Sequence, residues 1–213
     1  MFCVTSPVFR TTKTPLRSAI VLLALLLGPE QAHSQLTSEW DTARIWTKFE
    51  DALQRPEKVL RLDLTKQKWK DFDHRLRRFR QLRELILDRN RIDSIPPWIS
   101  EFQHLERLSI RSNRLRSITP DLLEVGTLRV LDLADNEIEG IPEDIDHLAL
   151  LERLILWSNL IGHFPPSLSR LEHLVELDLL HNEMSVDEQI WVRELLPGRT
   201  LHFSPPCQCR FDD

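Results

Sequence analysis

Apolar side chains recur along this chain with a period of 23 residues, and mostly polar side chains fill the positions between them. The copy over residues 128–138, LRVLDLADNEI, has apolar groups at positions 1, 4, 6 and 11 and an asparagine at position 9. Five further copies line up with it, and they begin at Val59, Leu82, Leu105, Leu151 and Leu174. One such unit cannot bury its own apolar face, so consecutive copies predict a solenoid in which neighbouring coils share a core.

Apolar residues recur at every second position within positions 3 to 7, as in Leu131 and Leu133, which predicts a short strand. Successive strands are expected to lie about 4.8 Å apart as a parallel sheet on the concave wall. Pro96, Pro142 and Pro165 then end the strand period. Apolar residues return at a three-residue step, as in Ile145 and Leu148, which predicts helical or 3₁₀ turns on the convex wall. The predicted fold class is therefore an α/β solenoid with a parallel concave sheet.

One amide per repeat follows the strand and is expected to turn the chain. Because an asparagine side chain carries both donors and an acceptor, it can satisfy backbone groups of neighbouring coils. We therefore expect structural turn residues, not ligands, at Asn90, Asn113, Asn136, Asn159 and Asn182. The first repeat is degenerate, since Gln67 replaces the asparagine and Trp69 replaces the position-11 leucine.

The segment before the repeats, residues 35–58, is predicted to be an N-terminal helical cap. Trp46, Phe49 and Leu53 share one face at helical spacing, and Pro56 ends the helix. A solenoid needs such a cap because its first coil would otherwise expose its core. Trp40 and Trp46 are therefore expected to be core residues rather than ligand-stacking residues.

The segment after the repeats, residues 185–204, is predicted to be a cap made of a helix and a strand. Residues 185–188 read SVDE, the form of a capping box, so a helix is expected from there to Leu196. Trp191 and Leu195 are expected on its inner face. Residues 200–203 are predicted to form a last short strand that shields the sheet edge.

The N-terminal region differs from the rest of the chain in composition. Residues 1–34 hold three basic side chains, then the apolar run from Ala19 to Leu27, and small residues at Ala32 and Ser34. This order is typical of a secretory signal peptide, although an organelle transit peptide is the alternative. The run is too short for a membrane span, so no stable membrane insertion is expected after its removal. The mature chain would carry 25 basic and 32 acidic residues, a net charge of −7.

These features together resemble the leucine-rich repeat family in its 23-residue form. The repeats fit the pattern L-x-x-L-x-L-x-x-N-x-L over residues 59–184, six in number. With the export signal, the lead-in ALQRPEKVLRLDL and the closing ELLPGRTLHF, the chain resembles small secreted leucine-rich repeat proteins of bacteria. Its repeats also resemble the intracellular Ras-scaffold class, which lacks an export signal. The resemblance implies that the concave wall is the binding surface.

Trp157 is unusual among the side chains predicted to face solvent on the concave wall. With Ile155 and Leu180 it would form an exposed apolar patch near charged residues, which is typical of a protein interface. An indole that lies inward or under a helix is the alternative. The predicted partner-binding residues are Trp157, Ile155, Leu180, Arg153, Arg111, Arg107 and Asp132; Val130 and Ala134 are also expected to face solvent there.

Charge is unevenly distributed along the repeats. Residues 55–91 hold 13 basic and 6 acidic side chains, whereas residues 121–194 hold 4 basic and 17 acidic ones. Such a field can orient a charged partner, but it also fits an ordinary solvated surface. The convex segment HRLRRFR offers a candidate anion-binding set, Arg75, Arg77, Arg78 and Arg80, for an anionic polymer, a phosphate or a lipid head group.

The sequence offers little material for catalysis or for a bound metal. Asp135, Ser158 and His181 occupy position 8 of three adjacent coils, but serine lies between the other two, so they cannot form a hydrolase triad. No Gly-rich phosphate loop, H-E-x-x-H or paired metal-binding cysteine motif is present, and no cofactor is expected.

Two cysteines lie in the tail, residues 205–213. Cys207 and Cys209 are the only ones after the predicted signal peptide, and a bridge across one residue would be strained. Pairing between chains, a tail metal site with His202, a tail packed on the cap and a free tail all remain open. Two thiols and one histidine are too few ligands for a closed zinc site.

The sequence therefore predicts an exported, non-enzymatic binding module that recognises a protein or peptide on its concave wall, and not nucleic acid. A monomer that is secreted, periplasmic or on the cell surface is expected. The alternative is a structural or adhesive envelope component that binds an anionic glycan or lipid through the convex arginines.

Overall fold

The computed structural model describes residues 40–205. The predicted signal peptide, the first residues of the predicted N-terminal cap and the tail with Cys207 and Cys209 lie outside the described residues. The chain divides into two compact units, residues 1–42 and 43–213. Trp40, in the first unit, is buried, and the second unit holds every strand and helix described below.

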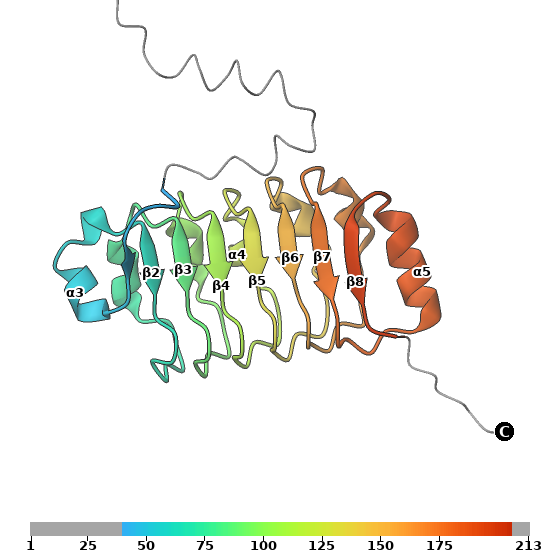
Figure 1. Cartoon of the computed structure of the whole chain (residues 1–213), viewed down its shortest axis with the longest axis horizontal. Coiled ribbons are helices and arrows are strands. Elements are labelled where there is room, and N and C mark those ends of the chain that lie inside the picture. Colours follow the sequence, from blue (N-terminus) through green and yellow to red (C-terminus); the bar gives the residue numbers. More distant parts are fainter. Residues whose placement is uncertain (1–39, 206–213) are drawn as a thin grey trace, which may run out of the picture. The chain divides into compact units, whose positions relative to one another are not determined.

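The second unit is a solenoid built on one parallel sheet of eight strands whose spatial order follows the chain from β1 to β8 (Figure 1). The strands are β1 (Ile45–Trp46), β2 (Arg61–Asp63), β3 (Glu84–Ile86), β4 (Arg107–Ser109), β5 (Val130–Asp132), β6 (Arg153–Ile155), β7 (Glu176–Leu179) and β8 (Thr200–Phe203). From β2 to β7 the register advances by one repeat per strand, so Leu62 pairs with Leu85 and Leu154 with Leu177. The offset between paired residues of neighbouring strands therefore equals the period of the sequence repeat.

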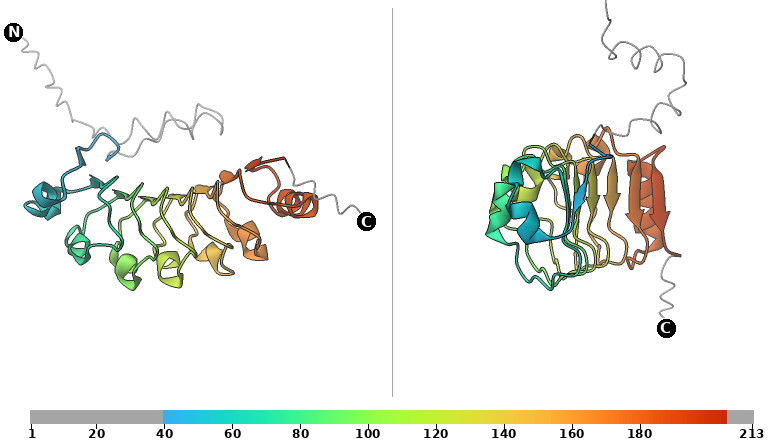
Figure 2. Two further views of the ribbon diagram at one scale, coloured as in Figure 1. Left: turned by 90° about the horizontal axis from the view of Figure 1, so that it is seen from below. Right: turned by 60° about the vertical axis from the view of Figure 1, so that its left-hand side comes forward.

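Short helical turns line the opposite, convex side of the coils (Figure 2). They are η1 (Pro56–Lys58), η2 (His74–Arg78), η3 (Pro97–Glu101), α4 (Pro120–Leu123), η4 (Ile145–His147) and η5 (Pro166–Arg170), whereas the helices α3 (Phe49–Leu53) and α5 (Val186–Leu195) lie at the two ends of the solenoid (Figure 1). Pro96 and Pro165 hold extended backbone immediately before η3 and η5, where their fixed φ suits the entry into a turn. The predicted α/β solenoid, with 3₁₀ and helical convex turns, is confirmed.

The core is a continuous stack of the repeat leucines. Leu131 and Leu133 of one coil, and Leu154 and Leu156 of the next, have no exposed surface. Position 1 of each repeat is equally buried, as Leu128 shows. Since each coil covers the apolar side of its neighbour, no coil could be removed without exposing the core of the next.

The predicted asparagines form a ladder beside this core. Asn159 illustrates it: its side-chain Nδ2 donates to the Leu133 and Leu156 carbonyls, 3.0 Å each, and its Oδ1 accepts the Ile138 N–H at 3.0 Å. Asn90, Asn113, Asn136 and Asn182 bridge adjacent coils in the same way. The degenerate Gln67 is exposed and donates only to Thr65 of its own coil.

The N-terminal cap is helical as predicted, but it begins with a strand that the pattern did not indicate. Trp46 lies in β1 and pairs with Leu62, so it extends the sheet instead of sharing a helix face with Phe49. The helix is limited to α3. Its Phe49 ring contacts Trp69 edge-on, with centroids 5.1 Å apart, and this contact covers the first coil.

The C-terminal cap contains the predicted capping box, in which Ser185 and Glu188 bond each other's backbone N–H groups. Strand β8 pairs with β7. The expectation for Trp191 was wrong: Gln189, Val192 and Leu196 face inward, and Trp191 is 38% exposed. These three residues define the face of the helix that packs inward, and Trp191 lies outside that face.

Candidate interaction surface on the inner face of the sheet

The concave side of the sheet presents three rows of side chains, from positions 3, 5 and 7 of each coil. Successive strands stack these positions side by side, so a row can be followed from one coil to the next. The face is hollowed between β3 and β6, where a cavity of about 340 Å³ lies over Ile86, Val130 and Ile155. We refer to this cavity as the inner hollow. It is large enough for part of a peptide but too open to enclose a small molecule.

Trp157 lies on this face, directly after β6, and is half-buried. Three other tryptophans, Trp46, Trp69 and Trp98, pack against the hydrophobic core, but Trp157 does not. Ile155 of the same strand and Leu180 of the next coil are half-buried beside it. None of these three apolar side chains belongs to the hydrophobic core or packs against it.

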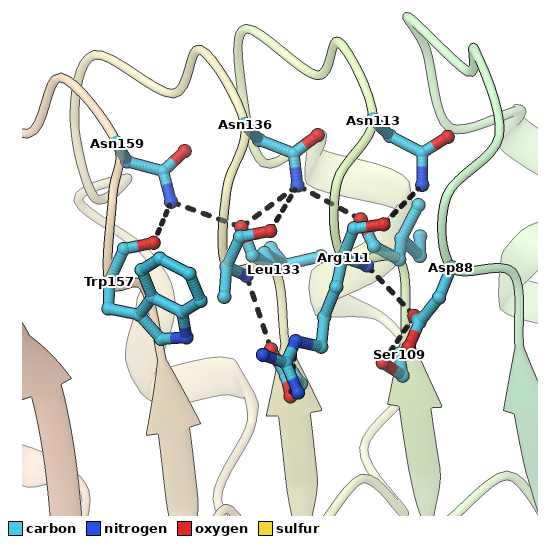
Figure 3. A network of polar contacts seen from close by, with 11 residues as sticks. Asp88, Ser109, Arg111, Asn113, Leu133, Asn136, Trp157 and Asn159 are labelled. Atoms are coloured by element: carbon cyan, nitrogen blue, oxygen red, sulfur yellow. Dashed lines mark hydrogen bonds and ion pairs between the residues drawn. The ribbon is translucent and has the colours of Figure 1, made fainter.

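The Trp157 indole is held by neighbours on both sides. Arg111, two coils earlier in the same row, places its guanidinium carbon 5.7 Å from the ring centroid, and His181 of the next coil lies edge-on at 6.3 Å. Between Trp157 and Arg111 lies Ala134, which was expected to face solvent but has no exposed surface. Because its methyl group is small, the side chains of Arg111 and Trp157 can contact each other across it. Figure 3 shows Trp157 and Arg111 in this setting.

Asp132 ties Arg111 to the sheet. Its carboxylate lies 3.7 Å from the Arg111 Nε and accepts the Ala134 N–H at 3.2 Å. Burial raises the pKa of the Asp132 carboxyl, although the Ala134 N–H and the Arg111 guanidinium oppose the shift. Arg111 is thereby oriented from one side by Asp132 and from the other by the indole, a combination of ion pair and cation–π contact.

The early part of the inner face, from β2 to β4, is closed by its own polar contacts. Buried Glu84 pairs with the Arg61 Nε and lies 3.8 Å from Arg107. Asp88 accepts the Ser109 hydroxyl at 2.6 Å and the Arg111 N–H at 3.0 Å (Figure 3). These groups satisfy one another, so a partner would have to break existing contacts to use them.

The predicted partner-binding residues therefore fall into two sets. Arg107, Asp132, Arg153 and Ile155 line the inner hollow, whereas Trp157 and Arg111 contact each other at the adjacent row. Leu180 follows Trp157 one coil on. The role of Ala134 and the contacts of Asp88 and His181 were not predicted, although the constant repeat spacing already places residues 88, 111, 134, 157 and 180 in one row.

The convex arginines lie on and after η2, and most have acidic partners. Arg75 pairs with Asp73 at 2.7 Å and with Glu50 at 3.0 Å. Arg77 and Arg80 both bind Glu101, at 2.5 and 3.3 Å, and within residues 40–205 Arg78 makes no ion pair. The Arg75 side chain lowers the pKa of Asp73, and Arg77 lowers that of Glu101. Most of the positive charge of this set is therefore compensated locally.

The position-8 residues serve the backbone turn. The backbone φ is 56° at Asp135, Ser158 and His181, 54° at Arg89 and 53° at Ser112. In the described part of the chain no side-chain hydrogen bond joins Ser158 to His181 or Asp135. No group of three or more metal-ligating side chains occurs within residues 40–205.

Known proteins with similar repeats were found by sequence and by structure. Family models of the leucine-rich repeat match residues 81–102 and 103–161. A leucine-rich repeat protein of Leptospira interrogans is 25% identical, covers 77% of this chain and 49% of its own, and has a TM-score of 0.60. An internalin of Listeria monocytogenes, 17% identical over 76% of this chain and 45% of its own, shares the fold with a TM-score of 0.61. No curated protein matches by sequence.

A third similar structure is the leucine-rich repeat ectodomain of a plant membrane receptor kinase from Arabidopsis thaliana, solved in complex with Casparian strip integrity factor 2. It is 28% identical, covers 61% of this chain and 16% of its own, and has a TM-score of 0.55. The chain thus spans about half the length of the bacterial protein from Leptospira and a sixth of the plant ectodomain. Within residues 40–205 no helix has the length and apolarity that a bilayer crossing requires.

Proposed function

Since this chain is a leucine-rich repeat protein in which no helix or strand of residues 40–205 covers the inner face of the sheet, we propose that it is a non-enzymatic binding protein. It recognises a protein or peptide partner on that face, with Trp157 as the central contact. The leucine-rich repeat fold commonly mediates binding between proteins, which gives the proposal its general basis. The plant ectodomain of similar fold was solved in complex with another molecule, Casparian strip integrity factor 2.

The observation that carries the proposal is the position of Trp157. Burial of an aromatic side chain at an interface is worth several times the burial of a small residue, and tryptophan is enriched among the strongest interface contacts. Trp157 is outside the core, half-buried and already oriented by Arg111 and His181. A partner can therefore bury the rest of the ring with little loss of side-chain entropy.

The location of the protein is part of the same proposal. The basic and then apolar lead of residues 1–34 would direct the chain out of the cytoplasm, so the binding protein would act in the periplasm, at the cell surface or in the medium. A monomer would present one inner face to one partner. Cys207 and Cys209, if oxidised there, offer a covalent link between chains.

The decisive experiment compares two tryptophans that are both partly exposed and both outside the core. A partner captured by the wild type from native surroundings is purified, and its affinity is then measured for the wild type, Trp157→Ala and Trp191→Ala. We expect Trp157→Ala to weaken binding at least about tenfold, as for a central interface residue, and Trp191→Ala to change it less than about twofold. Equal loss in both variants, or in neither, would rule out Trp157 as the central contact.

The alternative function, an adhesive envelope component that binds an anionic glycan or lipid, relies on Arg75, Arg77, Arg78 and Arg80. It has weaker support, because three of these arginines are ion-paired with Asp73, Glu50 or Glu101. Binding through them would weaken steeply as salt is added, whereas apolar contact on Trp157 would not.

A further inference from the structure

The turns that follow the strands lie along one edge of the solenoid, and their solvent-facing side chains change sign along that edge (Figure 1). These side chains come from positions 8, 10 and 12, since from the second repeat on positions 9 and 11 hold the bridging asparagine and a core residue. The first three repeats place seven basic side chains at these positions: Lys66, Lys68, Lys70, Arg89, Arg91, Arg114 and Arg116. The next three repeats place no lysine or arginine there but four acidic side chains: Asp135, Glu137, Glu139 and Glu183.

Most of these cations are not compensated by the protein. All seven side chains are exposed, and within residues 40–205 only Arg116 makes an ion pair, with Glu137 at 3.3 Å. Asp71 and Asp93 lie in the same turns but pair with none of them. The whole chain has a net charge of −5, so this positive surplus is local. We refer to the unpaired cations as the basic strip: Lys66, Lys68, Lys70, Arg89, Arg91 and Arg114.

The backbone of the turns holds the basic strip in place. The Lys66 N–H donates to the Asp88 carbonyl at 3.0 Å, and the Arg91 N–H donates to the Trp69 carbonyl at 2.7 Å, so the first two coils are bonded to each other in both directions. The third coil is bonded to the second in the same way, through the Arg114 N–H. Cations on neighbouring coils are therefore anchored about 4.8 Å apart, one strand spacing. A polyanion meets these charges without having to order a loop.

The width of the basic strip distinguishes between polyanions. Three coils span about 10 Å at one strand spacing each, and the carboxylates of Asp135, Glu137 and Glu139 on the fourth coil border them. A membrane surface or a nucleic-acid duplex laid on this edge would also cover those carboxylates and be repelled by them, whereas a single narrow chain would not. Single-stranded nucleic acid is bound largely by stacking on aromatic side chains, and positions 8, 10 and 12 of these three coils hold none.

We propose that the basic strip binds a linear sulfated polysaccharide. So many cations within three coils favour a ligand of high charge density, which sulfate groups on successive sugars supply, and both lysine and arginine bond such oxyanions through charge-assisted hydrogen bonds. A folded protein partner is disfavoured, because the strip offers no apolar centre to bury. The basic strip is separate from the inner face of the sheet and from the arginines of η2. It adds a second binding surface that does not depend on the proposed function.

Heparin is the probe, titrated into the full chain and followed by calorimetry. We expect saturable binding whose affinity falls steeply as salt is raised, because each cation that contacts the polymer releases counterions. Desulfated heparin, polyglutamate and vesicles of anionic phospholipid are the comparison probes. Each should bind at least about fivefold more weakly than heparin, since the first two lack sulfate and the third also meets the carboxylates of the fourth coil. No saturable binding of heparin, or equal affinity for any comparison probe, would overturn the proposal.

Two charge-matched variants locate the site. The strip variant replaces Lys66, Lys68 and Arg89 by Asn and Arg91 by Gln; Asn suits the first three positions because their φ lies between 54° and 62°. The convex variant removes the same number of charges by replacing Arg75, Arg77, Arg78 and Arg80 with Gln. We expect heparin to bind the strip variant at least about tenfold more weakly than the wild type, and the convex variant less than about threefold more weakly. Wild-type affinity in the strip variant, or an equal loss in both, contradicts the assignment.

A second strip variant guards against a loss of folding. It replaces Lys70, Arg91 and Arg114 by Gln and leaves the positions of positive φ untouched. It should unfold in urea at the same midpoint as the wild type and still bind heparin at least about fivefold more weakly. Unchanged heparin affinity in this variant would overturn the proposal whatever the first variant does.

The outcome can be told apart from that of the proposed function. Trp157→Ala leaves the basic strip intact and should bind heparin like the wild type, and the strip variant should bind a captured protein partner like the wild type. If heparin binding depends on Trp157 instead, the polysaccharide lies on the inner face and the assignment to the basic strip is wrong. If heparin does not bind at all, recognition of a protein through Trp157 still stands.

Discussion

The early and late parts of the inner face are built on the same backbone and differ in what their side chains do. From β2 to β4, charged groups are bonded to one another: Glu84 to Arg61, and Asp88 to Ser109. From β5 to β7, the face holds the apolar group of Trp157, Ile155 and Leu180, and Arg153 has no partner among the described residues.

This difference indicates over which part of the inner face a partner can bind with a net gain of free energy. Binding over the early part would desolvate charges that are already satisfied, and the cost of this would cancel much of the gain. Binding over the late part would bury apolar surface that is now in contact with water and would give Arg153 a partner. One scaffold therefore carries a closed region and an open region within three strands of each other.

The largest expected effect tests whether the scaffold beneath the two regions is equivalent. Asn90, in the early part, and Asn159, in the late part, are both buried and bridge two coils through matching hydrogen bonds. Asn90→Ala and Asn159→Ala should each lower the free energy of unfolding by about 2–4 kcal/mol, because buried backbone groups lose their partners. Urea unfolding measures this.

A matched control for the ladder is Gln67→Ala, which should cost less than about 0.5 kcal/mol because Gln67 is exposed and bonds only its own coil. A loss at Asn159 but not at Asn90 would show that the two regions differ in their scaffold as well as in their surface.

The second prediction contrasts one residue from each region. Asp88→Ala should lower the free energy of unfolding by about 1–2 kcal/mol, because the Ser109 hydroxyl and the Arg111 N–H lose their acceptor. Trp157→Ala should lower it less, since the ring is not part of the core. Partner affinity should instead fall more in Trp157→Ala than in Asp88→Ala. If Trp157→Ala proves the more destabilising in urea, its role is structural and the distinction between the regions fails.

The third prediction uses two aspartates whose pKa values move in opposite directions. Burial raises the pKa of Asp132, so its ionisation costs stability as the pH rises through that value. Asp132→Asn should therefore be slightly more stable than the wild type at neutral pH. The two proteins should converge as the pH falls below the ordinary aspartate pKa of about 3.9.

On the convex side the sign reverses. The Arg75 guanidinium lowers the pKa of Asp73, so ionised Asp73 contributes stability above about pH 3.9, and that stability is lost as the pH falls through the lowered value. Asp73→Asn should be less stable than the wild type at neutral pH, and the difference should shrink in acid. Thermal unfolding of both variants and the wild type at neutral and acidic pH checks these expectations. A stability change of the same sign in both variants at neutral pH would contradict the assignment.

The smallest effect is expected from the convex arginines. Replacement of Arg75, Arg77, Arg78 and Arg80 by Gln should change partner affinity less than about twofold, because most of their charge is compensated and they lie away from the inner face. Affinity measured at about 0.05 M and 0.5 M salt checks this. A steep loss with salt that the quadruple variant abolishes would favour the anionic-surface alternative.

Most of the fold followed from the period of the sequence. Leu82, Leu105 and Leu128 recur at one spacing, and a strand register must match that spacing if each coil is to cover the next. The caps were harder. The pattern did not predict strand β1, since Trp46 fits a helix face and a strand equally well until Leu62 is placed beside it. Trp191 was placed on the wrong side of α5 because two residues cannot fix a helical phase.

The candidate surface was partly predictable. The repeat puts Trp157, Ile155 and Arg153 on the concave wall, and the structure places them there. The sequence could not show that Ala134 is covered, or that Arg111 turns toward Trp157. These depend on side-chain rotamers across two coils, which no local pattern encodes.

By itself, the sequence determined the number of coils, their register and the positions that face the core, because apolar burial at a fixed period admits one stacking arrangement. Only the tertiary structure decided which charges are neutralised and which are left to a partner. Glu84 takes both Arg61 and Arg107, and Glu176 lies against His202 rather than Arg153. Such choices depend on distances between side chains from different coils, and electrostatic attraction falls off with those distances, not with separation along the chain.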